Sequence, residues 1–134
     1  MTDIRILVAG EASGEVLILR ERLSFWGGID PATGEIVDVH HPQRGANVAG
    51  KILLMPGGRG SSSSSSVLAE AIRAGTAPAA IVLLEPDPIL ALGAIVAREL
   101  YGVVMPVVVA DAGGLRSGEA ASMTADRSGL TTRT

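Results

Sequence analysis

The sequence predicts a single α/β domain, in which a strand-rich first half is followed by the order β-α-β-α-β in one sheet system. Three observations support this fold class. Short apolar runs of strand length recur along the chain, two later segments carry apolar residues at helical spacing, and Gly and Pro separate them. A chain of 134 residues fits one domain with a modest core. Because aromatic residues make up only 2% of the chain, this core must consist of Val, Ile, Leu and Ala.

Two strands are predicted near the N-terminus. Apolar residues within 4–8 alternate with polar or small ones, which predicts the first strand. The glycine-containing segment 10–14 is expected to interrupt it, and 16–19 forms a second short strand. The segment 23–34 is rich in turn residues and holds the only Phe and the only Trp, while 36–40 alternates weakly.

The middle of the chain predicts a strand, a helix and another strand. A strand is predicted over 51–55, because the residues that follow Lys51 form a continuous apolar run, which is typical of a buried strand. A run of serines then leads into apolar residues with helical spacing, and this helix is expected to stop at Gly75. The next strand is predicted over 80–84.

A second helix is predicted to begin with Asp87 as its N-cap and Pro88 as its first residue. It is expected to run to about residue 100, and to be largely buried because apolar residues surround it on all sides. A final strand is predicted over 103–110, with an interruption at Met105-Pro106. Residues 113–134 show little periodicity, so we expect a tail that is loosely ordered or tied down by a partner.

Charge and composition exclude several functional classes. The net charge is −3 and no cluster of Lys and Arg occurs, which disfavours nucleic-acid binding. No apolar run reaches 18 residues, so no membrane span is expected, and the N-terminus lacks a signal-peptide layout. We therefore expect a cytoplasmic protein. Because the chain has no Cys, it cannot hold a thiolate-bound zinc or iron–sulfur site, although another chain can.

The serine loop, which we define as residues 57–66, carries the main chemical signal. It follows a buried strand and opens a helix, where glycines allow close approach to a ligand and free N–H groups attract anions. Arg59, Gly60, Ser62 and Ser63 are therefore candidates for binding a carboxylate or phosphate. A serine hydroxyl held by N–H groups and a cation in a water-poor site is also a candidate base.

The serine run has a second interpretation, because polyserine is often a flexible linker. Its position between a buried strand and an apolar helix favours the anion site. Other motifs fail: the Lys of a Walker A loop and the second Gly of a nucleophile elbow are missing. His40 and His41 are interpreted as surface residues near a turn, since neighbours on an extended segment point apart and a third metal ligand is lacking.

Several motifs, in order, resemble the swivel domain of the aconitase X family over about residues 1–110. They are Leu23-Ser24-Phe25-Trp26-Gly27-Gly28-Ile29-Asp30-Pro31, Thr33-Gly34, His41-Pro42, Gly50-Lys51, Gly57-Gly58-Arg59-Gly60-Ser61-Ser62, Ala77-Pro78-Ala79-Ala80-Ile81-Val82 and Pro88-Ile89-Leu90-Ala91-Leu92-Gly93-Ala94. The resemblance implies a swivelling β/β/α domain of the aconitase type over 1–112, ahead of the tail. It also implies a large subunit, or fused domain, that holds an iron or iron–sulfur centre, with no metal bound by this chain.

The family resemblance further implies a dehydratase acting on a small carboxylate substrate. Members dehydrate cis-3-hydroxy-L-proline to a pyrroline-2-carboxylate or dehydrate 5-phosphomevalonate, and the loop here is closer to the hydroxyproline type. The family's proton acceptor directly follows the loop glycine, which places it at Ser61. The Arg that follows the serines in aconitases proper is missing, so the cation for the carboxylate stays open.

The resulting hypothesis is a shared site. The substrate carboxylate binds at the helix start, Ser61 removes the C2 proton, and the 3-hydroxyl leaves with help from a metal on the partner chain. Trp26 and Phe25 are expected close to the serine loop or at the interface with the large subunit. Phosphomevalonate dehydration and a non-catalytic regulatory module that binds an anion are the alternatives.

Overall fold

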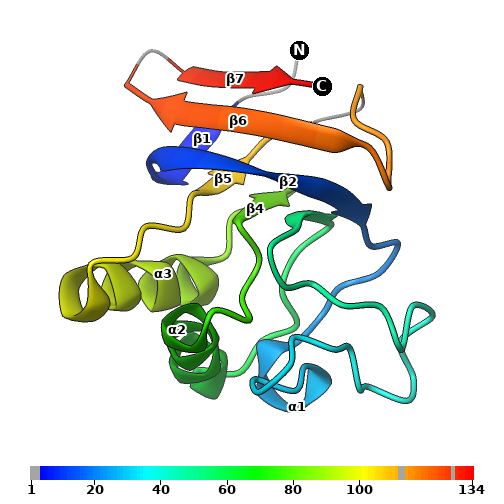
Figure 1. Ribbon diagram of the computed structural model, residues 1–134. Helices are drawn as coiled ribbons and strands as arrows, with labels where there is room; N and C mark the ends of the chain where they lie inside the picture. Colours follow the sequence, from blue (N-terminus) through cyan, green and yellow to red (C-terminus); the bar gives the residue numbers. More distant parts are fainter. Residues whose placement is uncertain (1–3, 112–113, 128) are drawn as a thin grey trace.

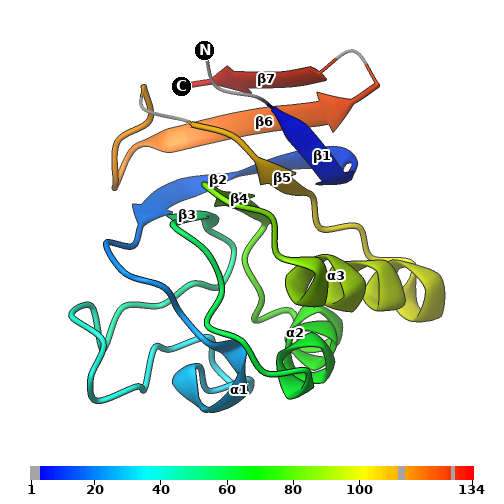
Figure 2. The same cartoon turned by 180° about the vertical axis from the view of Figure 1, so that it is seen from behind.

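The computed structural model describes residues 4–111, 114–127 and 129–134. Its centre is a mixed sheet of seven strands in the order β1-β5-β4-β3-β2-β6-β7 (Figures 1 and 2). The strands are β1 (Arg5–Val8), β2 (Gly10–Ile18), β3 (Ile52–Met55), β4 (Ala80–Leu83), β5 (Val107–Val109), β6 (Ala120–Asp126) and β7 (Gly129–Arg133). The four central strands β2 to β5 are parallel, and the others pair antiparallel at the two sides.

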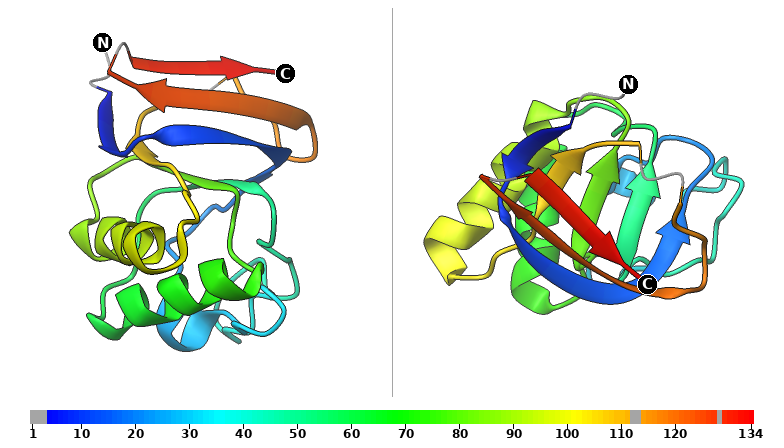
Figure 3. Two further views of the ribbon diagram at one scale, coloured as in Figure 1. Left: turned by 60° about the vertical axis from the view of Figure 1, so that its left-hand side comes forward. Right: turned by 90° about the horizontal axis from the view of Figure 1, so that it is seen from above.

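Two long helices cover one face of the sheet, α2 (Ser63–Ala74) and α3 (Pro88–Tyr101). They connect β3 to β4 and β4 to β5, and lie on the side away from β6 and β7 (Figures 1 and 3). This is the β-α-β-α-β order that the sequence predicts, with both helix stops confirmed at left-handed glycines, Gly75 and Gly102. None of the helices in the described part of the chain is long and apolar enough to cross a membrane.

Alternation along the central strands divides the core into two clusters. Leu53, Ile81 and Val107 face α2 and α3, whereas Ile52 and Val82 face the side covered by β6. Since both faces are covered, β3 and β4 are buried along their whole length, which explains their continuous apolar sequence. The sheet curls into a half-barrel around the second cluster (Figure 3).

The structure corrects the prediction for residues 10–14. They do not interrupt a strand but belong to β2, which pairs with β6 from Gly10 to Glu15. Gly14 is present for close packing, because a Cβ there would overlap the carbonyl oxygen of Gly50.

The C-terminal segment also differs from the expected loosely ordered tail. Where the structure describes it, β6 pairs with β2 and β7 pairs with β6. Ala121, Met123 and Ala125 alternate into the second core cluster. These are mostly small side chains, so their period of two is a weak signal in the sequence. The segment therefore completes the sheet.

Helix α3 is less buried than predicted. Its inner face includes Leu90, Ala94 and Ala97, but Leu92 and Leu100 are exposed. Some apolar residues of the helix therefore do not pack into this chain's core. Within the described structure they form an apolar outer face on α3.

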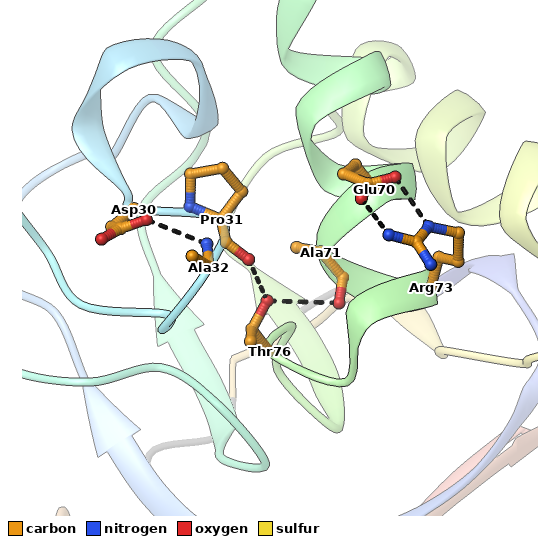
Figure 4. Close-up of polar contacts among 7 residues, drawn as sticks. All are labelled: Asp30, Pro31, Ala32, Glu70, Ala71, Arg73 and Thr76. Carbon is orange, nitrogen blue, oxygen red and sulfur yellow. Dashed lines mark hydrogen bonds and ion pairs between the residues drawn. The ribbon is translucent and has the colours of Figure 1, made fainter.

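A one-turn helix, α1 (Phe25–Gly28), precedes a loop that is fastened to the C-terminal end of α2. The hydroxyl of Thr76 donates to the carbonyl of Pro31 (2.6 Å), with the carbonyl of Ala71 also in reach at 3.4 Å (Figure 4). One turn earlier on α2, the Arg73 guanidinium donates to the Glu70 carboxylate, and this hydrogen bond lowers the pKa of Glu70. The loop before β3 is therefore held against α2 by specific polar contacts.

Candidate active site

Three loops meet at the carboxyl edge of the parallel strands. The segment after β2 leads to α1, the serine loop joins β3 to α2, and residues 84–87 join β4 to α3. Parallel strands end at one edge of a sheet, so both helix N-termini open there, as in ligand sites of other α/β folds. The fold thus brings the predicted anion loop to the usual functional edge.

Arg22 ties the three loops together. Its guanidinium forms an ion pair with Glu85 of the β4–α3 loop and donates to the carbonyl of Gly58 at 3.4 Å. In addition, the Arg59 N–H donates to the carbonyl of Leu23 at 3.2 Å. The start of the serine loop is therefore fixed from both neighbouring loops.

The paired glycines of the serine loop lie against side chains from the neighbouring loops. A Cβ on Gly57 would overlap the guanidinium of Arg22, and a Cβ on Gly58 would overlap the carboxylate of Asp87. Both side chains approach the backbone of the loop directly. The glycines thus allow close approach by the protein's own side chains, and the predicted close approach of a ligand stays a prediction.

The predicted substrate-binding residues form a cradle of N–H groups. Within the described residues, the N–H groups of Gly60, Ser61 and Ser62 have no hydrogen-bond partner in the protein. Gly60, Ser62 and Ser63 are exposed, and the Arg59 side chain is exposed beside them. Consecutive free N–H groups ahead of a helix, with a nearby cation, favour a carboxylate or phosphate.

Ser61 lies just before α2 and is half-buried. Its carbonyl accepts the N–H of Ser64 (2.9 Å), and its Oγ accepts the N–H of Ser63 at 3.3 Å. These two bonds hold the residue and leave the hydroxyl hydrogen free to donate. Ser61 therefore places a hydroxyl next to the free N–H groups of the loop.

Ser64 has a role that the sequence analysis misses. It is the most buried serine of the run, with 3% of its surface exposed. Its Oγ accepts the N–H of Trp26 at 3.3 Å and lies 3.5 Å from the Oγ of Ser24. Ser24 in turn donates to the carbonyl of Trp26 at 2.9 Å. Ser64 therefore connects α1 to the serine loop.

These contacts confirm that the Phe-Trp segment lies close to the serine loop. Its two aromatic residues have opposite roles, since Phe25 is fully buried in the core while the Trp26 side chain is 59% exposed. A rigidly held, exposed Trp at the edge of the site is typical of a contact surface for a ligand or partner.

We expect Ser64→Ala to destabilise the chain by about 1–3 kcal/mol, because the Trp26 N–H then loses its acceptor in a partly buried place. Urea unfolding followed by fluorescence measures this directly, since Trp26 is the only Trp. Ser66→Ala is the matched control, because Ser66 is exposed on the same helix. If the two variants unfolded at the same urea concentration with the same emission maximum, Ser64 would not connect the two segments.

Nearly the whole chain matches one protein family. The model of the aconitase X swivel domain matches residues 1–132. The chain belongs to the aconitase X swivel domain family. The resemblance on which the sequence analysis relied is thereby confirmed, and the family match extends through β6 and almost to the end of β7.

Relatives of this swivel domain carry two different names. A cis-3-hydroxy-L-proline dehydratase of Pseudomonas aeruginosa is 59% identical over 103 residues, covering 77% of this chain and 18% of that protein. A phosphomevalonate dehydratase small subunit of Methanothermobacter thermautotrophicus is 47% identical over 95 residues, covering 71% and 72%. The chain thus spans under a fifth of the first relative and most of the second. The swivel domain therefore occurs both within longer chains and as a small subunit.

A solved structure confirms the swivel fold. The crystal structure of Thermococcus kodakaraensis aconitase X in its holo-form has a TM-score of 0.83 and 37% identity, covering 97% of this chain and 95% of that chain. A UPF0107 protein solved by NMR in solution gives a TM-score of 0.80 and 34% identity, covering 97% and 96%.

Potential metal ligands do not gather in this swivel domain: no group of three or more His, Asp or Glu side chains is found among the described residues. The two histidines differ in burial. The expectation that both are surface residues is wrong for His41. His40 is exposed, but His41 is buried. The His41 Nδ1 accepts the N–H of Gln43 at 3.0 Å, so Nε2 carries the proton toward the carbonyl of Glu21 at 3.3 Å. His41 therefore supports the turn.

Proposed function

We propose that this chain is the small subunit of a hydro-lyase that dehydrates cis-3-hydroxy-L-proline to a pyrroline-2-carboxylate. The observation that carries the proposal is the free hydroxyl of Ser61 beside three consecutive free N–H groups. The hydroxyproline assignment is supported by the 59% identity to the Pseudomonas dehydratase, against 47% to the phosphomevalonate small subunit.

In this proposal the substrate carboxylate binds the N–H groups of Gly60, Ser61 and Ser62, with Arg59 as the nearby cation. Binding fixes C2, the carbon that bears the carboxylate, next to the Ser61 Oγ. Ser61 then accepts the C2 proton, and the carboxylate spreads the charge that develops at C2. The exposed N–H groups thus serve both binding and catalysis.

The partner in this proposal is the large aconitase X subunit. We assign an iron or iron–sulfur centre to it, because this chain has no Cys and its described residues form no metal site; such a centre supplies Lewis-acid help for the leaving hydroxyl. The exposed Trp26 is placed at the rim of the shared site, where the partner would cover it.

Phosphomevalonate is the second candidate substrate, because two small subunits of that dehydratase are 47% and 52% identical to this chain over 72% and 60% of their own length. Co-expression with the large subunit and an assay of both substrates decides between them. We expect dehydration of the hydroxyproline with a kcat/KM at least about 100-fold above that for phosphomevalonate. The reverse preference would establish the second candidate, and tight anion binding without any turnover would favour a regulatory module.

A further inference from the structure

Asp87 contributes only one of its carboxylate oxygens to the cap of α3. Its Oδ1 accepts the N–H groups of Ile89 at 3.0 Å and Leu90 at 3.2 Å. Its Oδ2 lies against the Cα of Gly58 in the serine loop. No hydrogen bond to Oδ2 occurs within the described part of the chain. The N-cap residue of α3 therefore directs an unused acceptor toward the other loop.

Asp87 and Ser61 line the same small pocket. It has a volume of about 10 Å³, and apolar side chains including Leu23, Phe25 and Leu90 form much of its wall. A space of this size accommodates about one water molecule, which is enough to join two groups that are not in direct contact. The geometry thus offers a short path from the Ser61 hydroxyl to the Asp87 carboxylate.

Positive charge lies around the Asp87 carboxylate. The N-terminus of α3 stabilises a carboxylate at its cap, and Arg59 also lines the pocket. The neighbouring Glu85 differs from Asp87, because its carboxylate forms an ion pair with Arg22 and lies next to Gly57 rather than Gly58. Asp87 is therefore the available acceptor on this side of the serine loop.

A serine needs such an acceptor in order to act as a base. Its alkoxide is high in energy, and the cost falls when the hydroxyl proton moves to a carboxylate as the new bond forms. We propose that Asp87 is a positioning residue that receives the Ser61 proton through one water molecule; this rests on the proposed function.

The step balances. The C2–H bond breaks and a new Ser61 O–H bond forms, while the original hydroxyl proton passes to the water and a proton of the water passes to Asp87. The C2–H electron pair first stays at C2, spread into the carboxylate, and becomes the C2=C3 bond when hydroxide leaves C3. The proton on Asp87 then neutralises the departed hydroxide, so the sum is loss of one water from the substrate.

The test is Asp87→Asn in the complex with the large subunit, compared with Asp87→Ser. Both replacements retain an N-cap acceptor, so α3 and the melting temperature are preserved, but neither can receive a proton. We expect kcat to fall at least about tenfold with little change in KM. We also expect loss of the acidic limb of the pH–kcat profile, which a purely structural residue would not alter. Glu99→Gln is the matched control and should keep that limb, because Glu99 is exposed near the other end of α3.

The outcomes separate the two proposals. Variants with wild-type kcat and pH profile in an active complex would overturn the role of Asp87 and leave the proposed function intact. A fall in kcat accompanied by a lower melting temperature and an unchanged pH profile would show that Asp87 acts only as the N-cap of α3, which would overturn its proposed role. A wild-type complex that is inactive on both substrates would overturn the proposed function, and this inference with it.

Discussion

Replacing Ser61 by alanine is expected to abolish most turnover while leaving the fold in place. The hydroxyl accepts one long hydrogen bond, from the Ser63 N–H at 3.3 Å, and the free N–H groups of the loop belong to the backbone. Substrate binding should therefore persist. Loss of a positioned base costs about 10²- to 10⁴-fold, and the loss should appear in kcat more than in KM.

Ser62→Ala and Ser63→Ala are the matched controls for that variant. Both residues are exposed neighbours on the same loop, and their hydroxyls make no hydrogen bond within the described structure. We expect each to retain kcat within a few-fold. If one of them lost activity instead of Ser61→Ala, the base would be that residue. If no single serine mattered, the loop would only bind the anion and the base would belong to the large subunit.

The second large effect is complete dependence on the partner chain. We expect the isolated chain to show no dehydratase activity, because nothing in its described part can polarise the leaving hydroxyl. Activity should appear when the purified large subunit is added, and should saturate as the complex forms. The large subunit alone is the control. Turnover by the isolated chain in the presence of a chelator would contradict the proposal that catalysis needs a metal centre on the large subunit.

The location of the site could be predicted from the sequence, because its signals are local. Glycines followed by serines after a buried strand predict an anion loop at a helix start, and the structure places such a loop there. The role of Ser64 was hidden because it is one of six consecutive serines. Helical spacing held a clue, because Ser64 lies four residues before Leu68 and so shares its buried face.

Contacts between distant loops could not be predicted in the same way. Asp87 is recognisable as a helix cap, but its approach to Gly58 depends on how the strands β3 and β4 align. The clamp formed by Arg22 and Glu85 joins residues more than sixty positions apart and has no local signature. Likewise, β6 shows its core face through Ala and Met rather than through large β-branched residues.

The most direct measurement is hydrogen exchange at C2 of the substrate. The assembled enzyme is incubated with cis-3-hydroxy-L-proline in D₂O, and deuterium at C2 of the recovered substrate is followed by mass spectrometry. We expect exchange by the wild-type complex and loss of exchange in the complex carrying Ser61→Ala, with substrate binding retained. Exchange at the wild-type rate in that variant would show that Ser61 is not the proton acceptor.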